Sequence, residues 1–183
     1  MKEKIREAGN NLLVVVIAVI IGLFFRNYCF EVRIVPTESM APTIESGQFV
    51  LLNKFVYFFK EPEREDIVLF SPPKGEPTLS DDVDIIKRAI GLPEDTIEIK
   101  DSHLYVNEKK YEEGYIKEPM LANFDFVTVP EEKLFIMGDN RNRSGDNRNW
   151  QNTFIPVESV KGKVIGVFDI PYMRDVACRV YHN

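Results

Sequence analysis

From Glu31 onward, glycine and proline divide the sequence into short apolar runs, and this pattern limits the fold more than any other feature. The runs are too short for ordinary helices, and several alternate apolar and polar residues as half-buried strands do. The pattern predicts strands over 32–35, 48–52, 66–70, 84–90, 96–100, 104–107, 126–129, 133–137 and 164–168. Because no long helix is expected among them, we expect a mainly β fold: an antiparallel β-barrel or a sandwich-like domain.

The N-terminal segment has a different character. Residues 12–25 contain no charged or strongly polar side chain, although this run is shorter than the roughly 20 residues of a spanning helix. Extension to 8–30 gives a full span that ends in the aromatic residues Tyr28 and Phe30, which suit a membrane interface. A buried helix is less consistent with a run that is apolar on every face, and no small-residue cleavage site follows it. We therefore expect one uncleaved N-terminal transmembrane helix over 8–30.

The charges before this segment predict its orientation. Residues 1–7 include three basic side chains, which favour a cytoplasmic N-terminus, although Arg26 on the other side weakens the bias. The expected protein is a single-pass protein of the cell membrane, in contact with the lipid bilayer. Residues 31–183 would form its extracytoplasmic domain.

Composition excludes several classes of function. The net charge of −6 gives no basic surface for phosphates, so we expect no nucleic-acid partner. Cys29 and Cys178 lack metal-type spacing, and we do not expect them to pair, although a disulfide stays open. His103 lies in an expected hairpin and His182 is penultimate, so neither is a good candidate for a Ser-His-Asp or zinc site. We expect no metal and no cofactor, and a hydrolase would need a base other than histidine.

Ser39 lies in a turn between two prolines. Pro36 and Pro42 each fix a backbone angle, and Thr37 supplies a second hydroxyl two residues before the serine. A hydroxyl held in this way is a candidate nucleophile. The alternative is an ordinary turn, because serine, threonine and proline are common turn residues.

Lys87 lies inside an expected strand, on the same face as Ile85 and Ala89. Burial among apolar neighbours disfavours the ammonium form, and a neutral amine is a competent general base. The alternative is an edge-strand lysine that discourages aggregation.

Residues 138–149 form a long expected loop that is rich in acids and arginines. Acid–arginine pairs can fix a loop through forked hydrogen bonds, and a fixed loop can hold Ser144 against another group. A calcium loop is excluded because Arg141 and Arg143 would occupy ligand positions. The alternative is a solvated charged loop.

The stretches 36–43, 86–95 and 138–148, in this order after an N-terminal apolar segment, resemble bacterial type I signal peptidase, the membrane-bound Ser/Lys leader peptidase. The resemblance implies Ser39 as nucleophile, Lys87 as its base and Ser144 as a hydrogen-bond partner of the lysine. It also implies an oxyanion site formed by the Ser39 backbone N–H and the Thr37 hydroxyl. Four loop residues would support the site: Asp139, Arg141, Asp146 and Arg148.

The resemblance also implies a substrate. Preproteins that bear signal peptides would add as a strand near Ile34 and Ile86, with Met40 helping to form shallow apolar pockets. Two residues depart from the family pattern, because the family often has an acid where Asn142 stands and a serine where Asn147 stands. The short stretch between Lys87 and Gly138 indicates a reduced β-hairpin subdomain around 95–125. Two alternatives to general signal-peptide removal stay open: an inactive membrane-tethered binding or assembly module, and a relative specialised for a few surface or pilus proteins.

Overall fold

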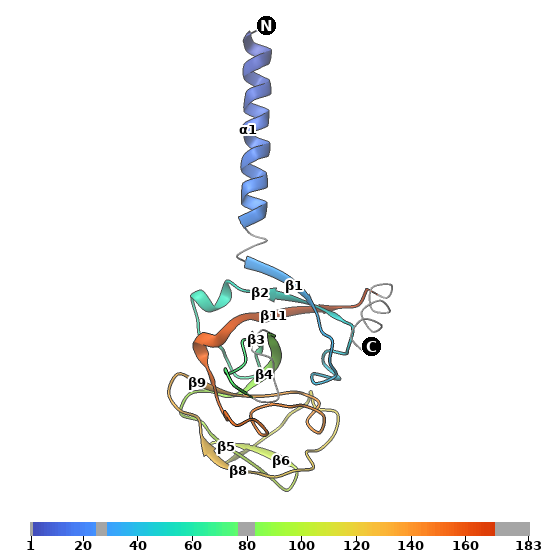
Figure 1. Ribbon diagram of the computed structural model, residues 1–183, viewed down its shortest axis with the longest axis vertical. Coiled ribbons are helices and arrows are strands. Elements are labelled where there is room, and N and C mark those ends of the chain that lie inside the picture. Colours follow the sequence, from blue (N-terminus) through green and yellow to red (C-terminus); the bar gives the residue numbers. More distant parts are fainter. Residues whose placement is uncertain (1, 25–28, 77–82, 171–183) are drawn as a thin grey trace.

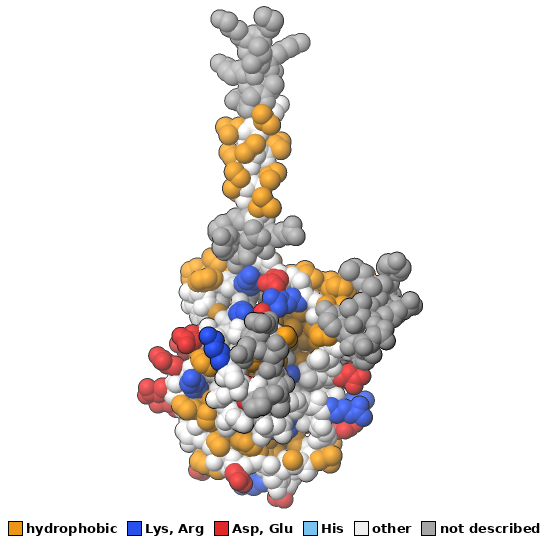
Figure 2. Space-filling model, in the orientation of Figure 1, with side chains coloured by type: hydrophobic (Ala, Val, Ile, Leu, Met, Phe, Trp, Pro, Cys, Tyr) orange, Lys and Arg blue, Asp and Glu red, His pale blue; other side chains and the backbone are white. Residues whose placement is uncertain are grey.

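The computed structural model describes residues 2–24, 29–76 and 83–170. Helix α1 (Lys2–Phe24) projects from the β domain at the end where β1 begins (Figure 1). Its side chains are described over residues 11–23, where the apolar ones are exposed and surround the helix (Figure 2). No helix within the described residues combines the length and hydropathy that a membrane span requires.

The larger sheet has seven antiparallel strands and forms a half-barrel, as the mainly β pattern predicts. Each expected strand is present, and its ends lie within four residues of the predicted ones. In spatial order the strands are β1 (Phe30–Ile34), β2 (Phe49–Asn53), β11 (Val160–Phe168), β3 (Ile67–Phe70), β4 (Ile85–Gly91), β9 (Lys133–Met137) and β10 (Ile155–Pro156). Two single-turn 3₁₀ helices accompany it, η2 (Val56–Phe58) and η3 (Val157–Ser159).

A second sheet lies at the end of the domain farthest from α1 (Figure 1). Its strands, in spatial order, are β7 (Lys109–Tyr111), β6 (His103–Val106), β5 (Thr96–Lys100) and β8 (Phe124–Thr128). The β-hairpin subdomain expected around 95–125 falls in the region of this four-stranded sheet. Its centre, β5 and β6, is the predicted hairpin, and β7 and β8 extend it on both sides.

The large sheet buries both faces because its side chains alternate. Leu69 of β3 lies in a core with Val35, Met40 and Ile44, inside the half-barrel. Its neighbour Val68 points to the opposite face and packs in a second core. That second core contains Val68, Phe70, Leu134, Ile136, Trp150 and Ile155.

Strands β1 and β4 run in the same direction, because β2, β11 and β3 separate them through successive antiparallel pairings. Among the described strands, β1 pairs only with β2. On the side away from β3, β4 pairs with β9 only from Arg88 onward. Residues 85–87 and β1 therefore present unpaired edges, and an Arg33–Asp84 ion pair of 3.0 Å joins β1 to the residue just before β4.

Candidate active site

The Ser39 turn follows β1 directly and is anchored by apolar residues. Val35, Met40 and Ile44 are buried in the half-barrel core, whereas Thr37 is exposed and Ser39 is half-buried. Backbone hydrogen bonds reinforce this, from Gly47 N to Val35 O (2.8 Å) and from Ile44 N to Met40 O (2.9 Å). The chain therefore places apolar side chains beneath the turn and presents the serine hydroxyl above it.

Lys87 meets Ser39 across the gap between β4 and the turn. Lys87 Nζ lies 2.6 Å from Ser39 Oγ, close enough for proton transfer. The lysine is 4% exposed and lies opposite Val68 in the β3–β4 pairing, on the face of the second core. Burial therefore decides between the two interpretations of Lys87 in favour of a desolvated amine.

The surroundings of Lys87 shift its acidity. Burial lowers the pKa of Lys87 to about 8, because desolvation disfavours the ammonium form. The negative charges of Asp146 and Asp139 oppose this shift and raise the pKa, while Arg148 adds to the lowering. A substantial fraction of the amine is therefore neutral near physiological pH.

Thr37 brings a second hydroxyl to the same place. Thr37 Oγ1 lies 3.2 Å from Ser39 Oγ, and either oxygen can donate. The threonine side chain is exposed and faces the space beside the serine. It can therefore donate a hydrogen bond to an oxygen that lies near the serine.

The loop after β9 contacts the backbone of the turn. Asn140 N donates to Ser39 O (3.1 Å), and Asn140 Nδ2 donates to Glu38 O (3.1 Å). A Cβ on Gly138 would collide with Ser144 Oγ and with the backbone oxygen of Ser39. Glycine is required here by close approach, and Asn140, which no sequence pattern indicated, joins the loop to the turn.

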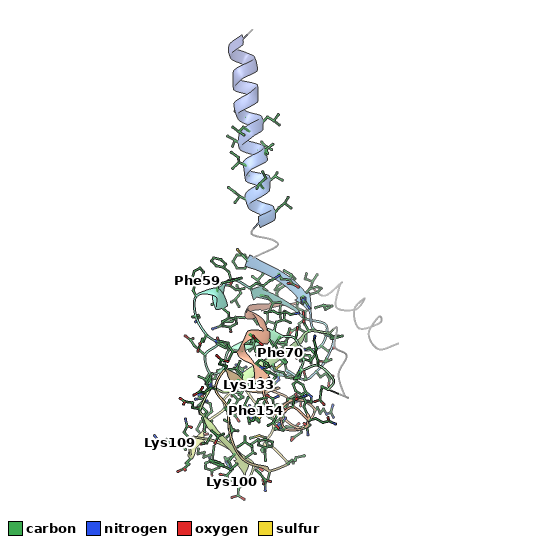
Figure 3. The ribbon with its side chains drawn as sticks, turned by 60° about the vertical axis from the view of Figure 1, so that its left-hand side comes forward. Phe59, Phe70, Lys100, Lys109, Lys133 and Phe154 are labelled. Atoms are coloured by element: carbon green, nitrogen blue, oxygen red, sulfur yellow. The ribbon has the colours of Figure 1, made fainter. Side chains whose placement is uncertain are left out.

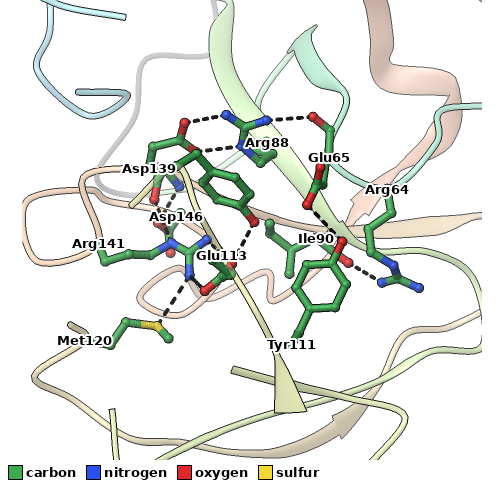
Figure 4. A network of polar contacts seen from close by, with 12 residues as sticks. Arg64, Glu65, Arg88, Ile90, Tyr111, Glu113, Met120, Asp139, Arg141 and Asp146 are labelled. Carbon is green, nitrogen blue, oxygen red and sulfur yellow. Dashed lines mark hydrogen bonds and ion pairs between the residues drawn. The ribbon is translucent and has the colours of Figure 1, made fainter. Parts of the chain in front are cut away.

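Asp139 is fixed by an arginine outside its loop. Arg88 donates to it twice, from Nε to Oδ1 (2.8 Å) and from Nη2 to Oδ2 (2.6 Å), while Thr43 donates to Oδ2 (2.5 Å). Arg88 also donates to the backbone oxygen of Glu65 (2.9 Å), so it lies between that residue and Asp139 (Figure 4). Arg88 follows Lys87, so one strand supplies both the candidate base and the group that holds Asp139.

Asp146 and Arg148 form a pair within the loop itself. Arg148 donates to both carboxylate oxygens, at 2.7 Å and 2.8 Å. Asp146 also accepts from Gly138 N (3.0 Å), and Arg148 donates to Arg141 O (2.8 Å). The expectation of acid–arginine pairs in this loop is met here, with Asp146 completely buried.

Arg141 forms its ion pair with the connection between strands of the small sheet, and it also donates from Nε to Gly138 O in its own loop (3.1 Å). Its guanidinium donates to both oxygens of Glu113, at 2.6 Å and 2.5 Å, with side-chain exposures of 0% and 3% (Figure 4). Tyr115 donates from its hydroxyl to Glu113 Oε1 (2.7 Å). The guanidinium carbon of Arg88 lies 3.9 Å from the centroid of the Tyr115 ring. Glu113 lies in a stretch whose pattern predicted neither strand nor helix, so no sequence signal identified it.

Ser144 lies near the site, beside Gly138, but does not hydrogen-bond to Lys87. Its hydroxyl oxygen is buried and has no hydrogen-bond partner among the described residues. The hydrogen bond to Lys87 that the resemblance implies is therefore not formed in this structure.

The two asparagines that depart from the family pattern each use both halves of the amide. Asn142 accepts from Leu121 N (3.1 Å) and donates to Pro119 O (3.0 Å). Asn147 accepts from Ile136 N (2.7 Å) and donates to Asn152 O (3.4 Å). A carboxylate can only accept and a serine has a shorter reach, so these departures fit local hydrogen bonds.

The three residues expected to bind substrate, Ile34, Ile86 and Met40, differ in how accessible they are. Ile34 and Ile86 are half-buried on the facing strands, whereas Met40 is fully buried and can shape a wall only from below. Among described residues no three metal-ligating side chains gather. Cys29 is buried and free, and His103 is exposed; Cys178 and His182 lie outside the described residues.

Comparison with known proteins identifies a family that the chain matches. The family described as "Signal peptidase, peptidase S26" matches residues 8–168. Signal peptidase I S of Bacillus subtilis is 39% identical over 151 residues, which cover 76% of this chain and 78% of that protein. Probable signal peptidase I-1 of Synechocystis sp. is 34% identical over 157 residues, covering 85% and 79%.

Two further relatives differ more in extent. The chain matches thylakoidal processing peptidase 1 of Arabidopsis thaliana with 35% identity over 175 residues, which is 91% of this chain but 49% of that protein. The crystal structure of a signal peptidase I from Enterococcus faecalis V583 has 32% identity and a TM-score of 0.48, covering 57% of this chain and 97% of that one. The length of the family match, together with these identities, shows that the chain belongs to the signal peptidase family, peptidase S26.

Proposed function

We propose that this protein is a serine endopeptidase that removes signal peptides from translocated preproteins with a Ser39–Lys87 dyad. The observation that carries the proposal is the 2.6 Å contact between a buried lysine nitrogen and a turn serine oxygen. The family and the named relatives support the substrate class.

The dyad supplies both proton transfers of acyl transfer. In the neutral amine form, Lys87 accepts the Ser39 proton as Oγ attacks the scissile carbonyl and forms the new C–O bond. The resulting ammonium then gives its proton to the leaving amine as the C–N bond breaks. A water molecule, deprotonated by the same amine, hydrolyses the acyl-enzyme and restores the serine hydroxyl.

The negative charge on the tetrahedral intermediate needs donors near Ser39. The Thr37 hydroxyl, 3.2 Å from Ser39 Oγ, and the Ser39 backbone N–H are the proposed donors. Removal of one such donor typically costs about 2.7–4 kcal/mol of transition-state stabilisation.

The loop residues have supporting roles in this proposal. Asp139 and Asp146 counter the loss of the lysine charge, and Arg141 and Arg148 hold the loop through their ion pairs. Ser144 has an unpaired hydroxyl and one rotatable bond, so we assign it as an acceptor for the Lys87 ammonium during turnover.

The substrate would bind as an added strand. The unpaired edges of β1 and of residues 85–87 are linked by the Arg33–Asp84 ion pair and, beyond the strand ends, by the Ser39–Lys87 contact. Backbone hydrogen bonds to these edges would align the peptide, as in other cases of strand addition. Ile34 and Ile86 would flank it, while Met40 with Val35 would form the floor of a shallow apolar pocket.

We further propose that α1 anchors the protein in the cell membrane, with residues 1–7 in the cytoplasm and residues 31–183 outside. The exposed apolar side chains around residues 12–23 support this placement, because such a surface is stable in lipid and costly in water. β1 starts close to the end of α1, so the dyad would lie near the outer face of the bilayer, where a preprotein emerges.

The test is cleavage of a purified preprotein by the full-length chain in detergent micelles. Ser39→Ala and Lys87→Ala should each abolish cleavage and leave the thermal unfolding midpoint close to that of the wild type. Lys133→Ala, on β9 away from the dyad, is the control. Cleavage at the wild-type rate by either dyad variant would refute the mechanism, and an inactive wild-type chain that still retains preprotein would favour a binding module instead.

A further inference from the structure

A cleft lined by residues of β1 and by Asp84, just before β4, is not used by the mechanism. It has a volume of about 670 Å³ and lies between β1, η2 and the start of β4. Its apolar lining comes from Phe55, Tyr57, Phe58, Leu69 and Val160. Five charged residues also line it: Glu31, Arg33, Lys54, Asp84 and Lys161.

The cleft and the dyad lie on the same pair of strands. Arg33 of β1 leads through the turn to Ser39, and Asp84 precedes Lys87 by three residues, about 10 Å of strand. The Arg33–Asp84 ion pair therefore joins the two facing strands at the cleft, as the Ser39–Lys87 contact joins them at the reaction centre. A peptide strand that follows this gap passes from one to the other.

The direction in which the bound peptide runs follows from the position of α1. This inference rests on the proposed function. The cleft includes η2, and Phe59 just after η2 lies at the end of the domain that faces α1 (Figure 3). A signal peptide held in the bilayer enters from this end. Residues before the scissile bond therefore lie toward the cleft, and residues after it lie beyond Ser39.

The charges around the cleft satisfy one another. The Asp84 carboxylate accepts from Lys161 Nζ (2.6 Å) and from Arg33 Nη1 (3.0 Å). On β1, Glu31 Oε2 lies 3.2 Å from Lys54 Nζ. Because the charged side chains already have partners, the apolar side chains are the part of the lining that a ligand can cover at low cost. A charged side chain in this place would lose hydration and would have to break a pair, whereas an apolar one gains contact area.

We propose that this cleft is a substrate subsite for an apolar side chain, supplied by the fifth residue before the scissile bond. Val35 shares a strand face with Arg33 and Glu31, and it lies in the half-barrel core, so this face points inward. In an added strand the first, third and fifth residues before the cut share one face. With the first residue beside Ile86, the third lies level with the Arg33–Asp84 pair and the fifth enters the cleft.

The experiment uses two peptides that differ only at this position, with leucine or serine as the fifth residue before the cut and alanine at the first and third. The wild-type chain in detergent micelles should cleave the leucine peptide with a kcat/KM about tenfold higher, as expected for one apolar side chain in a pocket. Phe58→Ser and Phe55→Ser should reduce this ratio toward one.

Phe59→Ser is the matched control, because Phe58 and Phe59 are adjacent and 76% and 74% exposed, but only Phe58 lines the cleft. Phe59→Ser should leave the leucine-to-serine ratio unchanged. Equal effects of the two variants would assign these aromatic residues to the lipid interface and overturn the subsite. Equal cleavage of both peptides by the wild type would also overturn it while the proposed function stands, whereas cleavage of neither peptide or preprotein would overturn the proposed function itself.

Discussion

The turn that carries Ser39 and the loop over residues 138–148 lie against each other but are built differently. The turn is exposed from Pro36 to Glu38, including the Thr37 hydroxyl, whereas Ser39 is half-buried and its hydroxyl contacts Lys87. The loop is mostly buried, and three ion pairs fix it: Arg88–Asp139, Arg148–Asp146 and Arg141–Glu113. The reacting group thus lies on a turn that is held by apolar side chains and backbone hydrogen bonds, whereas buried ion pairs hold the loop beside it.

This difference predicts two separate kinds of variant. Changes in the turn should reduce turnover with little effect on stability, because few contacts are lost. Changes in the loop's ion pairs should reduce stability first, because they leave charges buried without a partner. Gly138 and Asn140, where the two segments touch, should affect both properties.

The largest expected effect is on stability, from Glu113→Ala. It leaves the fully buried Arg141 guanidinium without its carboxylate, and loss of one partner of a buried pair costs about 3–5 kcal/mol. Urea unfolding of the full-length chain in detergent measures this as a lower midpoint. Glu112→Ala is the control, because that acid is exposed and its pair with Lys110 lies at the surface, so a change within about 0.5 kcal/mol is expected. Equal midpoints for the two variants would contradict the assigned role of the Arg141–Glu113 pair.

Next is Thr37→Val, which removes a proposed oxyanion donor from the turn and keeps the side-chain shape. We expect kcat to fall about 10²–10³-fold, with KM and the unfolding midpoint nearly unchanged. Thr37→Ser retains the hydroxyl and should retain most of the activity. If Thr37→Val lowers stability instead of kcat, then the turn is as firmly built as the loop and the contrast between them is lost.

Gly138→Ala should disturb both segments, because its Cβ would collide with Ser144 and with the backbone oxygen of Ser39. Crowding of this kind typically costs about 1–3 kcal/mol, and displacement of Ser39 should lower kcat as well. Gly91→Ala is the matched control: its Cβ would lie 2.9 Å from Phe135 Cβ, far from the turn, so it should lower the midpoint while the folded fraction keeps its kcat. An unchanged kcat in Gly138→Ala would show that the loop does not position the turn.

The smallest expected effect is on pH dependence. Because the neutral amine of Lys87 is the active form and its pKa is about 8, kcat/KM should rise as pH increases through about 8. Asp146→Asn removes a charge that raises this pKa and leaves Arg148, which lowers it, so the rising limb should move to lower pH. Glu158→Gln, an exposed acid on η3, should not move it. A limb in Asp146→Asn that stays in place, or moves to higher pH, would contradict the assigned electrostatic role.

Much of the fold could be predicted from the sequence because strand patterns are local. β-branched and apolar runs between glycines and prolines gave the large sheet's main strands, whereas the short β7 and β10 carried no comparable pattern. Ser39 and Lys87 could be proposed from their local surroundings and from the order of three motifs. Arg88, Asn140 and Glu113 could not, because nothing near them in the sequence indicates which distant group they contact.

The sequence by itself determined the β character and the apolar N-terminal helix, since each depends on neighbouring residues, and the order of three motifs indicated the two residues of the candidate dyad. Only the tertiary structure decided that Lys87 is buried beside Ser39, that Asp139 pairs with Arg88, and that Glu113 reaches Arg141 from the small sheet. Burial and ion pairing join residues far apart in the chain. Both depend on how the sheets curve and pack, and alternation along a single strand carries no information about that.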